Sequence, residues 1–278
     1  MGTELKIGDL TFSRYSGGGW NGWVLKGLDI SGKLETWLAP GGSQVLAESL
    51  CRRVACCLLD GRKVFLKIMW AQNDGAVKKR ELTSLAKWAL GPSRAIGILK
   101  VTSAMLASGL LCPVPIAGLR KKAYNGRHLN LLATWEVAAP TVESILQSGS
   151  RGEAEEAVKT AAKELARLHS LHFVHGDFLP RNACLDSGGF YFLDNDKTWH
   201  WPFMPPWFLR VRNLEQFAYN LMLQGGLETC DMELPGGFLD AYAQASSVDV
   251  DRGRLLSRAR ARWERKRMRE GAGKAPLP

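Results

Sequence analysis

One segment in the second half of the chain constrains its fold more than any other. It reads His175-Gly-Asp-Phe-Leu-Pro-Arg-Asn182, and Asp194 follows twelve residues later within Phe192-Leu-Asp-Asn-Asp-Lys197. Phosphoryl transfer needs a carboxylate for the proton of the attacking hydroxyl, and an amide and a second carboxylate for metal ions on the phosphates. A loop of the form His-x-Asp-x-x-x-x-Asn supplies the first two of these groups. The segment predicts Asp177 as the catalytic base and Asn182 and Asp194 as metal ligands.

Each of these residues also has a plain structural interpretation. Asp and Asn side chains cap turns, and Asp caps helices. The whole ordered set, with a hairpin between Asn182 and Asp194, favours the chemical interpretation over separate caps. We expect His175 to belong to the catalytic set by bracing the loop through hydrogen bonds.

A strong hairpin signal lies in the first third of the chain. The runs 52–59 and 62–69 resemble strands, and Asp60-Gly61 between them suits a turn in which both residues have positive φ. Alternation places Val64, Leu66 and Ile68 on one face of the second strand and Phe65, Lys67 and Met69 on the other. Lys67 is the natural candidate for binding nucleotide phosphates.

The order of expected elements defines the fold class. The first third is β-rich, and helices are expected over 77–89 and 93–108. A strand at 129–137 precedes the break Ala138-Ala139-Pro140, and an amphipathic helix is expected over 153–169. We predict an α+β, bilobal fold with a β-rich N-lobe and a mainly helical C-lobe. The predicted divisions are residues 1–138, 139–250 and a basic tail at 251–278.

These segments together resemble the lipopolysaccharide core kinases, the Kdo and heptose kinases related to protein kinases. The resemblance covers roughly 52–223 and includes Asp60–Lys67, Ser93–Ala95, Gly109–Pro115, the stretch 166–197 and Arg212-Asn-Leu214. It implies ATP and Mg²⁺ as cofactors and a sugar hydroxyl of the inner core as acceptor. By this resemblance Lys67 anchors phosphates. In a kinase-like fold, Glu136 and Val137 lie in the hinge that binds adenine.

The sequence departs from that family in one respect. The family carries a glutamate after its Ser-x-Ala element that pairs with the lysine, whereas the stretch 96–100 has no acid. Glu81 is a candidate substitute. Two glycine groups, Gly17–Gly19 and Gly41–Gly42, are alternatives for covering the phosphates. Two other functions stay open: transfer to another small-molecule or protein hydroxyl, and a nucleotide-binding pseudokinase scaffold.

Basic charge is concentrated at the C-terminal end. Residues 251–278 carry ten Lys/Arg and three Asp/Glu, so they account for +7 of the formal net charge of +10. Leu255, Leu256, Ala259 and Trp263 fall on one side of an expected helix. Such a helix suits an anionic membrane surface or phosphorylated glycolipid; a solvated helix is the alternative, and nucleic acid is less favoured.

The N-terminal residues and the cysteines bear on the compartment. Met1–Phe12 has no cationic start followed by an apolar run, so no secretory signal is expected. The six cysteines form no C-x-x-C pair and no regular framework, which favours reduced thiols. We therefore expect a cytoplasmic protein that can lie peripherally on the inner membrane face.

Overall fold

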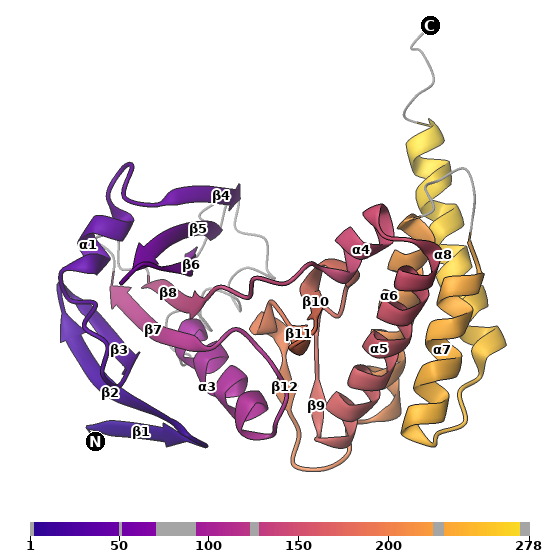
Figure 1. Cartoon of the computed structure of the whole chain (residues 1–278), viewed down its shortest axis with the longest axis horizontal. Helices are drawn as coiled ribbons and strands as arrows, with labels where there is room; N and C mark the ends of the chain where they lie inside the picture. Colours follow the sequence, from indigo (N-terminus) through magenta and orange to yellow (C-terminus); the bar gives the residue numbers. More distant parts are fainter. Residues whose placement is uncertain (1–2, 50–51, 71–92, 123–127, 225–230, 273–278) are drawn as a thin grey trace, which may run out of the picture. The chain divides into compact units, whose positions relative to one another are not determined.

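The structure is a computed structural model that describes residues 3–49, 52–70, 93–122, 128–224 and 231–272. The chain divides into two compact units, Met1–Val137 and Ala138–Pro278. The first unit is β-rich and the second is mainly helical (Figure 1), which confirms the predicted α+β fold class.

The first unit is built on one antiparallel sheet. Its eight strands lie in the order β1-β2-β3-β7-β8-β6-β5-β4. The strand bounds are β1 Glu4–Ile7, β2 Leu10–Gly17, β3 Trp20–Leu25, β4 Gln44–Ser49, β5 Arg52–Leu59, β6 Arg62–Trp70, β7 Pro115–Lys122 and β8 His128–Trp135. The strand β6 is therefore interior, because β5 and β8 pair with its two edges.

The β5–β6 hairpin forms as predicted. Asp60 and Gly61 adopt φ values of 50° and 77°, the two positive values that a tight two-residue turn requires. Val54 and Leu132 lie on the two sides of Lys67 in the ladder. The hydrogen-bonded neighbours on both sides fix the backbone of Lys67.

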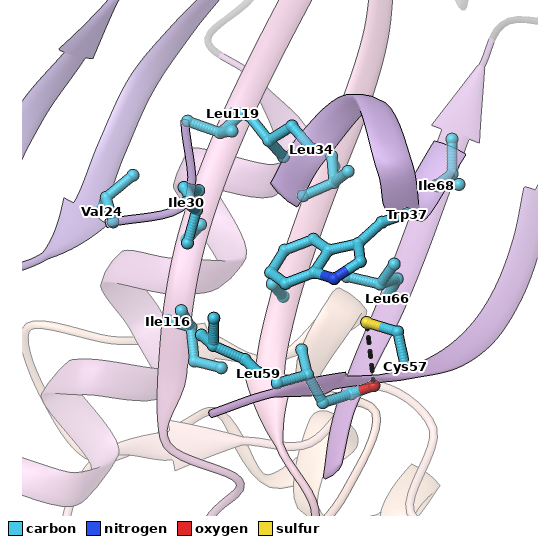
Figure 2. Packing of buried hydrophobic residues seen from close by; sticks show 14 of the residues in the cluster. Val24, Ile30, Leu34, Trp37, Cys57, Leu59, Leu66, Ile68, Ile116 and Leu119 are labelled. Atoms are coloured by element: carbon cyan, nitrogen blue, oxygen red, sulfur yellow. Dashed lines mark hydrogen bonds between the residues drawn. The ribbon is translucent and has the colours of Figure 1, made fainter. Parts of the chain in front are cut away.

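The two faces of the sheet bury different residues, and the predicted alternation along β6 is confirmed. Val64, Leu66 and Ile68 belong to the cluster in Figure 2, which Leu34 and Trp37 of α1 (Lys33–Leu38) complete. Met69 belongs to a second cluster with residues of α3 (Arg94–Ala107). Since side chains alternate along a strand, Lys67 lies on the face that α3 covers.

The helix α3 confirms the expectation for 93–108, and its start is fixed by polar contacts. The Ser93 hydroxyl accepts a hydrogen bond from the Ile96 amide at 3.4 Å and donates one to Asn130 Oδ1 at 2.7 Å. Asn130 is buried in β8, so it joins the helix to the sheet. The helix expected over 77–89 lies outside the described residues.

In the second unit the long helices pack side by side. They are α5 (Arg151–Ser170), α6 (Trp207–Gln224), α7 (Glu233–Ser246) and α8 (Arg252–Ala272), with the short α4 (Val142–Ser148) beside α5. Figure 1 shows α7 against α5 and α8 beside α6. The predicted apolar stripe of α5 is confirmed, because Val158, Ala161, Ala162, Leu165 and Leu168 are all buried.

The apolar side of α8 packs within this unit. Ala259 and Trp263 are buried against Ala218, Tyr219 and Met222, and Leu256 packs partly buried on the same cluster. The arginines of α8 lie on its exposed side. No helix in the described part of the chain is long and apolar enough to cross a membrane.

Candidate active site

A pair of short strands brings the predicted metal ligands together. The strands β10 (Ala183–Asp186) and β11 (Gly189–Phe192) form the expected hairpin, between Asn182 and Asp194. The Leu193 amide donates to the Asn182 carbonyl at 2.8 Å. The hairpin therefore brings the chain back to Asn182, because Leu193, the residue before Asp194, is hydrogen-bonded to Asn182.

His175 is fully buried and connects the candidate catalytic loop, residues 175–182, to the segment before Asp194. Its Nδ1 accepts from the Asp177 amide at 3.3 Å, and its Nε2 donates to the Leu193 carbonyl at 2.8 Å. Burial lowers the pKa of His175, although the hydrogen bond to Leu193 and the nearby aspartates oppose this shift. A neutral ring with its proton on Nε2 satisfies both contacts.

Asn182 and Asp194 offer the kind of oxygen atoms that a magnesium ion binds. Asn182 Nδ2 donates to the Asp177 carbonyl at 2.9 Å, which leaves Oδ1 as an oxygen ligand. Asp194 adopts the left-handed conformation with φ 54° and ψ 54°, which costs about 1–3 kcal/mol for a non-glycine residue and gathers at functional sites. Among the described residues no cluster of three His, Cys, Asp or Glu suits a metal. Mg²⁺ commonly uses one or two protein oxygens with substrate phosphates, so these residues fit.

Two contacts position the carboxylate of Asp177. Gln216 Nε2 of α6 donates to Oδ1 at 2.7 Å, and Lys197 Nζ lies 3.9 Å from Oδ2. The Asp177 side chain keeps 27% of its surface exposed, so a substrate can reach it. Sequence reasoning assigned no role to Gln216 or Lys197. Gln216 is 39 residues away along the chain and no local pattern marks it, whereas Lys197 ends the motif that contains Asp194.

Gly176 has no room for a side chain. A Cβ at this position would lie 2.4 Å from the Lys197 carbonyl oxygen and 2.5 Å from the Lys197 Cβ. The Gly176 amide donates to that carbonyl at 3.1 Å. The glycine before Asp177 therefore allows the loop 175–182 to contact the segment after Asp194.

A series of buried hydrogen bonds connects the helices to the His175 end of the loop 175–182. Arg210 donates from Nε and Nη2 to the Tyr242 hydroxyl at 3.0 and 2.8 Å, and this hydroxyl donates to His169 Nδ1 at 2.8 Å. His169 Nε2 then donates to Asn213 Oδ1 at 3.1 Å, and Asn213 Nδ2 donates to the His175 carbonyl. Each of these hydrogen bonds joins a donor to an acceptor when His169 is neutral. Burial and the nearby Arg210 lower the pKa of His169 to about 3, although the bond to Asn213 opposes this.

The first unit contains the other predicted residues. Lys67 is half-buried on β6. After β8, the Glu136 amide donates to the Lys63 carbonyl at 3.1 Å and the Glu136 carboxylate lies 3.3 Å from Lys63 Nζ. Within the described backbone, the Glu136 carbonyl and the Val137 amide have no hydrogen-bond partner. The carbonyl can accept a hydrogen bond and the amide can donate one, which matches the donor and the acceptor on an edge of adenine.

The proposed partner of Lys67 and the phosphate-covering glycines remain predictions. The sequence of α3 contains no Asp or Glu, and Glu81 lies outside the described residues. Gly18 and Gly19 form the β2–β3 turn with φ values of 56° and 78°, and Gly41 lies after α1 with φ 78°. Gly42 packs against the Thr36 carbonyl, which explains why that position needs glycine.

Comparison with solved structures defines the class of fold. The chain has a protein-kinase-like fold, and this fold is similar to that of WaaP in complex with acyl carrier protein. The match has a TM-score of 0.55 at 16% sequence identity and covers 86% of this chain and 93% of the WaaP chain. WbdD, solved with a kinase inhibitor, matches with a TM-score of 0.45 at 16% identity over 77% of this chain and 44% of the WbdD chain. No protein-family model and no curated protein matches the sequence.

Proposed function

We propose that the protein is an ATP-dependent kinase that phosphorylates a sugar hydroxyl of the lipopolysaccharide inner core. The observation that carries this proposal is a set of hydrogen bonds that join Asp177 to Asn182 and to the buried His175, and His175 to Leu193, the residue before Asp194. The WaaP-like fold and the sequence resemblance to core kinases support the sugar acceptor.

In this proposal Asp177 receives the proton of the acceptor hydroxyl. The acceptor oxygen forms a bond to the γ-phosphorus while the bond from this phosphorus to the bridging oxygen breaks, and ADP leaves with the electron pair. Lys67 binds nucleotide phosphates, and Glu136 and Val137 offer backbone groups to adenine. Asn182 and Asp194 would hold Mg²⁺, which neutralises charge on the phosphates. Gln216 and Lys197 fix the direction of the Asp177 carboxylate.

The pseudokinase scaffold is the second candidate, and one observation favours it. The helix α3 covers the Lys67 face of the sheet but contributes no carboxylate. In the core-kinase family that the sequence resembles, a glutamate at this place pairs with the lysine, so a change at this position would lower turnover. Transfer to a different hydroxyl, on a small molecule or protein, is the third candidate and uses the same residues.

The arginine side of α8 bears on the partners of this function. Its apolar residues Ala259 and Trp263 are buried, so contact with an anionic membrane or phosphorylated glycolipid would be electrostatic, through the exposed arginines. Such contact would place the protein at the inner membrane face.

The direct test is transfer of labelled γ-phosphate from ATP to deacylated core oligosaccharide in the presence of Mg²⁺. We expect Asp177→Ala and the near-isosteric Asp177→Asn to lower the rate by about 10²–10⁴-fold, the usual effect of losing a general base. Asp240→Asn, at an exposed position of α7, is the matched control and should retain activity. Bound ATP without transfer to any hydroxyl acceptor would favour the scaffold instead.

A further inference from the structure

A hollow of about 420 Å³ lies in the second unit, and its lining includes Gly176, the residue before Asp177. We call it the tryptophan hollow and define it by Gly176, Lys197, Trp199, Trp201, Phe208 and Arg212. Its connection to the candidate base is short, because Lys197 Nζ is 3.9 Å from Asp177 Oδ2. The roles assigned above to the nucleotide and metal residues do not use this hollow.

Strand alternation explains why two indoles line it. The strand β12 (Trp199–His200) pairs with β9 (Phe173–Val174), and the Trp201 amide continues the contact by donating to the His172 carbonyl at 2.8 Å. Residues two apart lie on the same face of an extended chain, so Trp199 and Trp201 share one face. His200 points the other way and stacks on Phe173 with ring centroids 4.3 Å apart.

The aromatic lining is left open to solvent. Trp199 and Phe208 expose 64% and 68% of their surface. Concave sites lined by aromatic side chains, with a few polar groups, are typical of small-molecule binding. A pyranose ring presents an apolar face of C–H groups that matches an indole face, and its hydroxyls match polar groups at the edge.

The charged residues that line the hollow are basic, which favours an anionic ligand. Its lining contains two cations, Lys197 and Arg212, and no Asp or Glu. Arg212 forms no ion pair with any residue that the structure describes, whereas Lys197 has only the long contact to Asp177. A guanidinium binds carboxylate and phosphate groups in a bidentate way. A cationic acceptor would be repelled by the same two groups.

We propose that the tryptophan hollow is the acceptor subsite and that it binds a saccharide carrying a carboxylate or phosphate group. This inference rests on the proposed function, because the subsite is useful only if Asp177 is the base. The ring would stack on Trp199 and Trp201, and its anionic group would bind Arg212. Lys197 lines the same hollow and its Nζ is 3.9 Å from Asp177 Oδ2, so it would orient the acceptor toward the base.

The test measures saccharide binding without nucleotide, so that it does not depend on turnover. Calorimetric titrations would use methyl glucuronide, glucose 6-phosphate and the neutral methyl glucoside on the full-length protein. We expect at least one anionic probe to bind about 10-fold more tightly than the neutral one, the effect of one charge-assisted hydrogen bond. Comparison of the two anionic probes decides between carboxylate and phosphate.

Paired variants localise the binding. Arg212→Gln should lose about 10-fold in affinity for the anionic probe, Arg212→Lys should recover part of it, and Trp199→Ala should weaken both charged and neutral sugars. Arg167→Gln and Phe203→Ala remove an exposed arginine of α5 and an exposed aromatic outside the hollow, and they should leave affinity unchanged.

The inference and the proposed function fail in different ways. Equal affinity for charged and neutral probes, no binding of either anionic probe, or equal affinities of Arg212→Gln and Arg167→Gln would each overturn the subsite. Phosphate transfer that depends on Asp177 but keeps its KM for the acceptor in Arg212→Gln and Trp199→Ala would do so as well. Binding that follows the expected pattern without any phosphate transfer would contradict the kinase function and leave the saccharide site in place.

Discussion

His169 and His175 are two buried imidazoles whose neutral state is part of the structure. Both rings use one nitrogen as donor and one as acceptor, so a second proton would remove an acceptor that Tyr242 or Asp177 needs. His175 contacts the catalytic loop directly, and His169 reaches it through Asn213. Each therefore acts as a positioning residue for Asp177, and protonation of either would affect both stability and the loop.

The first prediction follows from the pKa of His169, which falls from 6.5 to about 3 on folding. Between these values the unfolded state binds more protons, so stability is complete above pH 6.5 and is lost as the pH falls. We expect this residue to lower the free energy of unfolding by about 2 kcal/mol between pH 7 and pH 5. Urea unfolding at both pH values measures it.

His169→Gln is the control for that experiment. It removes the titrating group, so the loss of stability between pH 7 and pH 5 should be smaller than in the unsubstituted protein, although the variant is less stable at pH 7. An equal pH dependence in both proteins would show that His169 does not titrate as the buried contacts require.

At the scale of elements, the site depends on close contact between loops that strands and helices support. The β10–β11 hairpin reverses the chain between Asn182 and Asp194. The helix α6 contributes Asn213 and Gln216 to the loop on one side, while its other side receives α8. Since the same helix packs on α8 and contacts Asp177, the C-terminal helix contributes to the stability of the site.

We predict that Gly176→Ala lowers kcat strongly, because its Cβ would collide with the Lys197 backbone and push apart the loops that contain Asp177 and Asp194. The expected loss is about 10²-fold, the order found when reacting groups are displaced by about 1 Å. Gly152→Ala in α5 is the control, because a Cβ there meets nothing within 4 Å. Nearly unchanged transfer in Gly176→Ala would refute the requirement for this contact.

A second prediction at this scale concerns α8. Trp263 is 3% exposed against α6, so Trp263→Ala should lower the free energy of unfolding by about 3–5 kcal/mol. Met268→Ala, at a position that is 65% exposed, should change it by less than about 0.5 kcal/mol. Chemical denaturation of both variants gives the comparison. Similar small effects would mean that α8 does not pack on α6 in solution.

For the whole molecule, the excess basic charge is concentrated at one end of the sequence. Residues 1–250 carry 27 basic and 24 acidic side chains, so most of the excess charge lies in the last 28 residues. The arginines of α8 stay exposed because its apolar side is used in packing. The proposed attraction of this helix to anionic partners should weaken as salt screens the charges.

The prediction for the whole molecule is that ATP with Mg²⁺ stabilises the protein against heat. At a concentration about 100 times its Kd, a ligand adds about 2.7 kcal/mol to the stability of the folded state. The rise in Tm should shrink when EDTA replaces Mg²⁺ and in Asp194→Asn, and differential scanning fluorimetry measures both. An equal rise with and without Mg²⁺ would contradict the roles given to Asn182 and Asp194.

Features that depend only on neighbouring residues could be predicted from the amino-acid sequence. The turn at Asp60-Gly61 needs only two residues that tolerate positive φ, and alternation then places Lys67 opposite Leu66. The stripe of α5 follows from the helical period, and the His-x-Asp-x-x-x-x-Asn spacing identified the loop. Tertiary structure alone decided which face each amphipathic segment meets, and it buried the apolar side of α8 on α6.

Only the tertiary structure could reveal Gln216, Asn213 and the path through His169 to Tyr242 as supports of the catalytic loop. The partners in these hydrogen bonds are separated by 32 to 73 residues along the chain. Their side chains meet because α5, α6 and α7 pack together, and no local pattern encodes such a contact. The physical reason is that hydrogen bonds in a buried network are selected by packing of whole helices, whereas turns and helical stripes are set within a few residues.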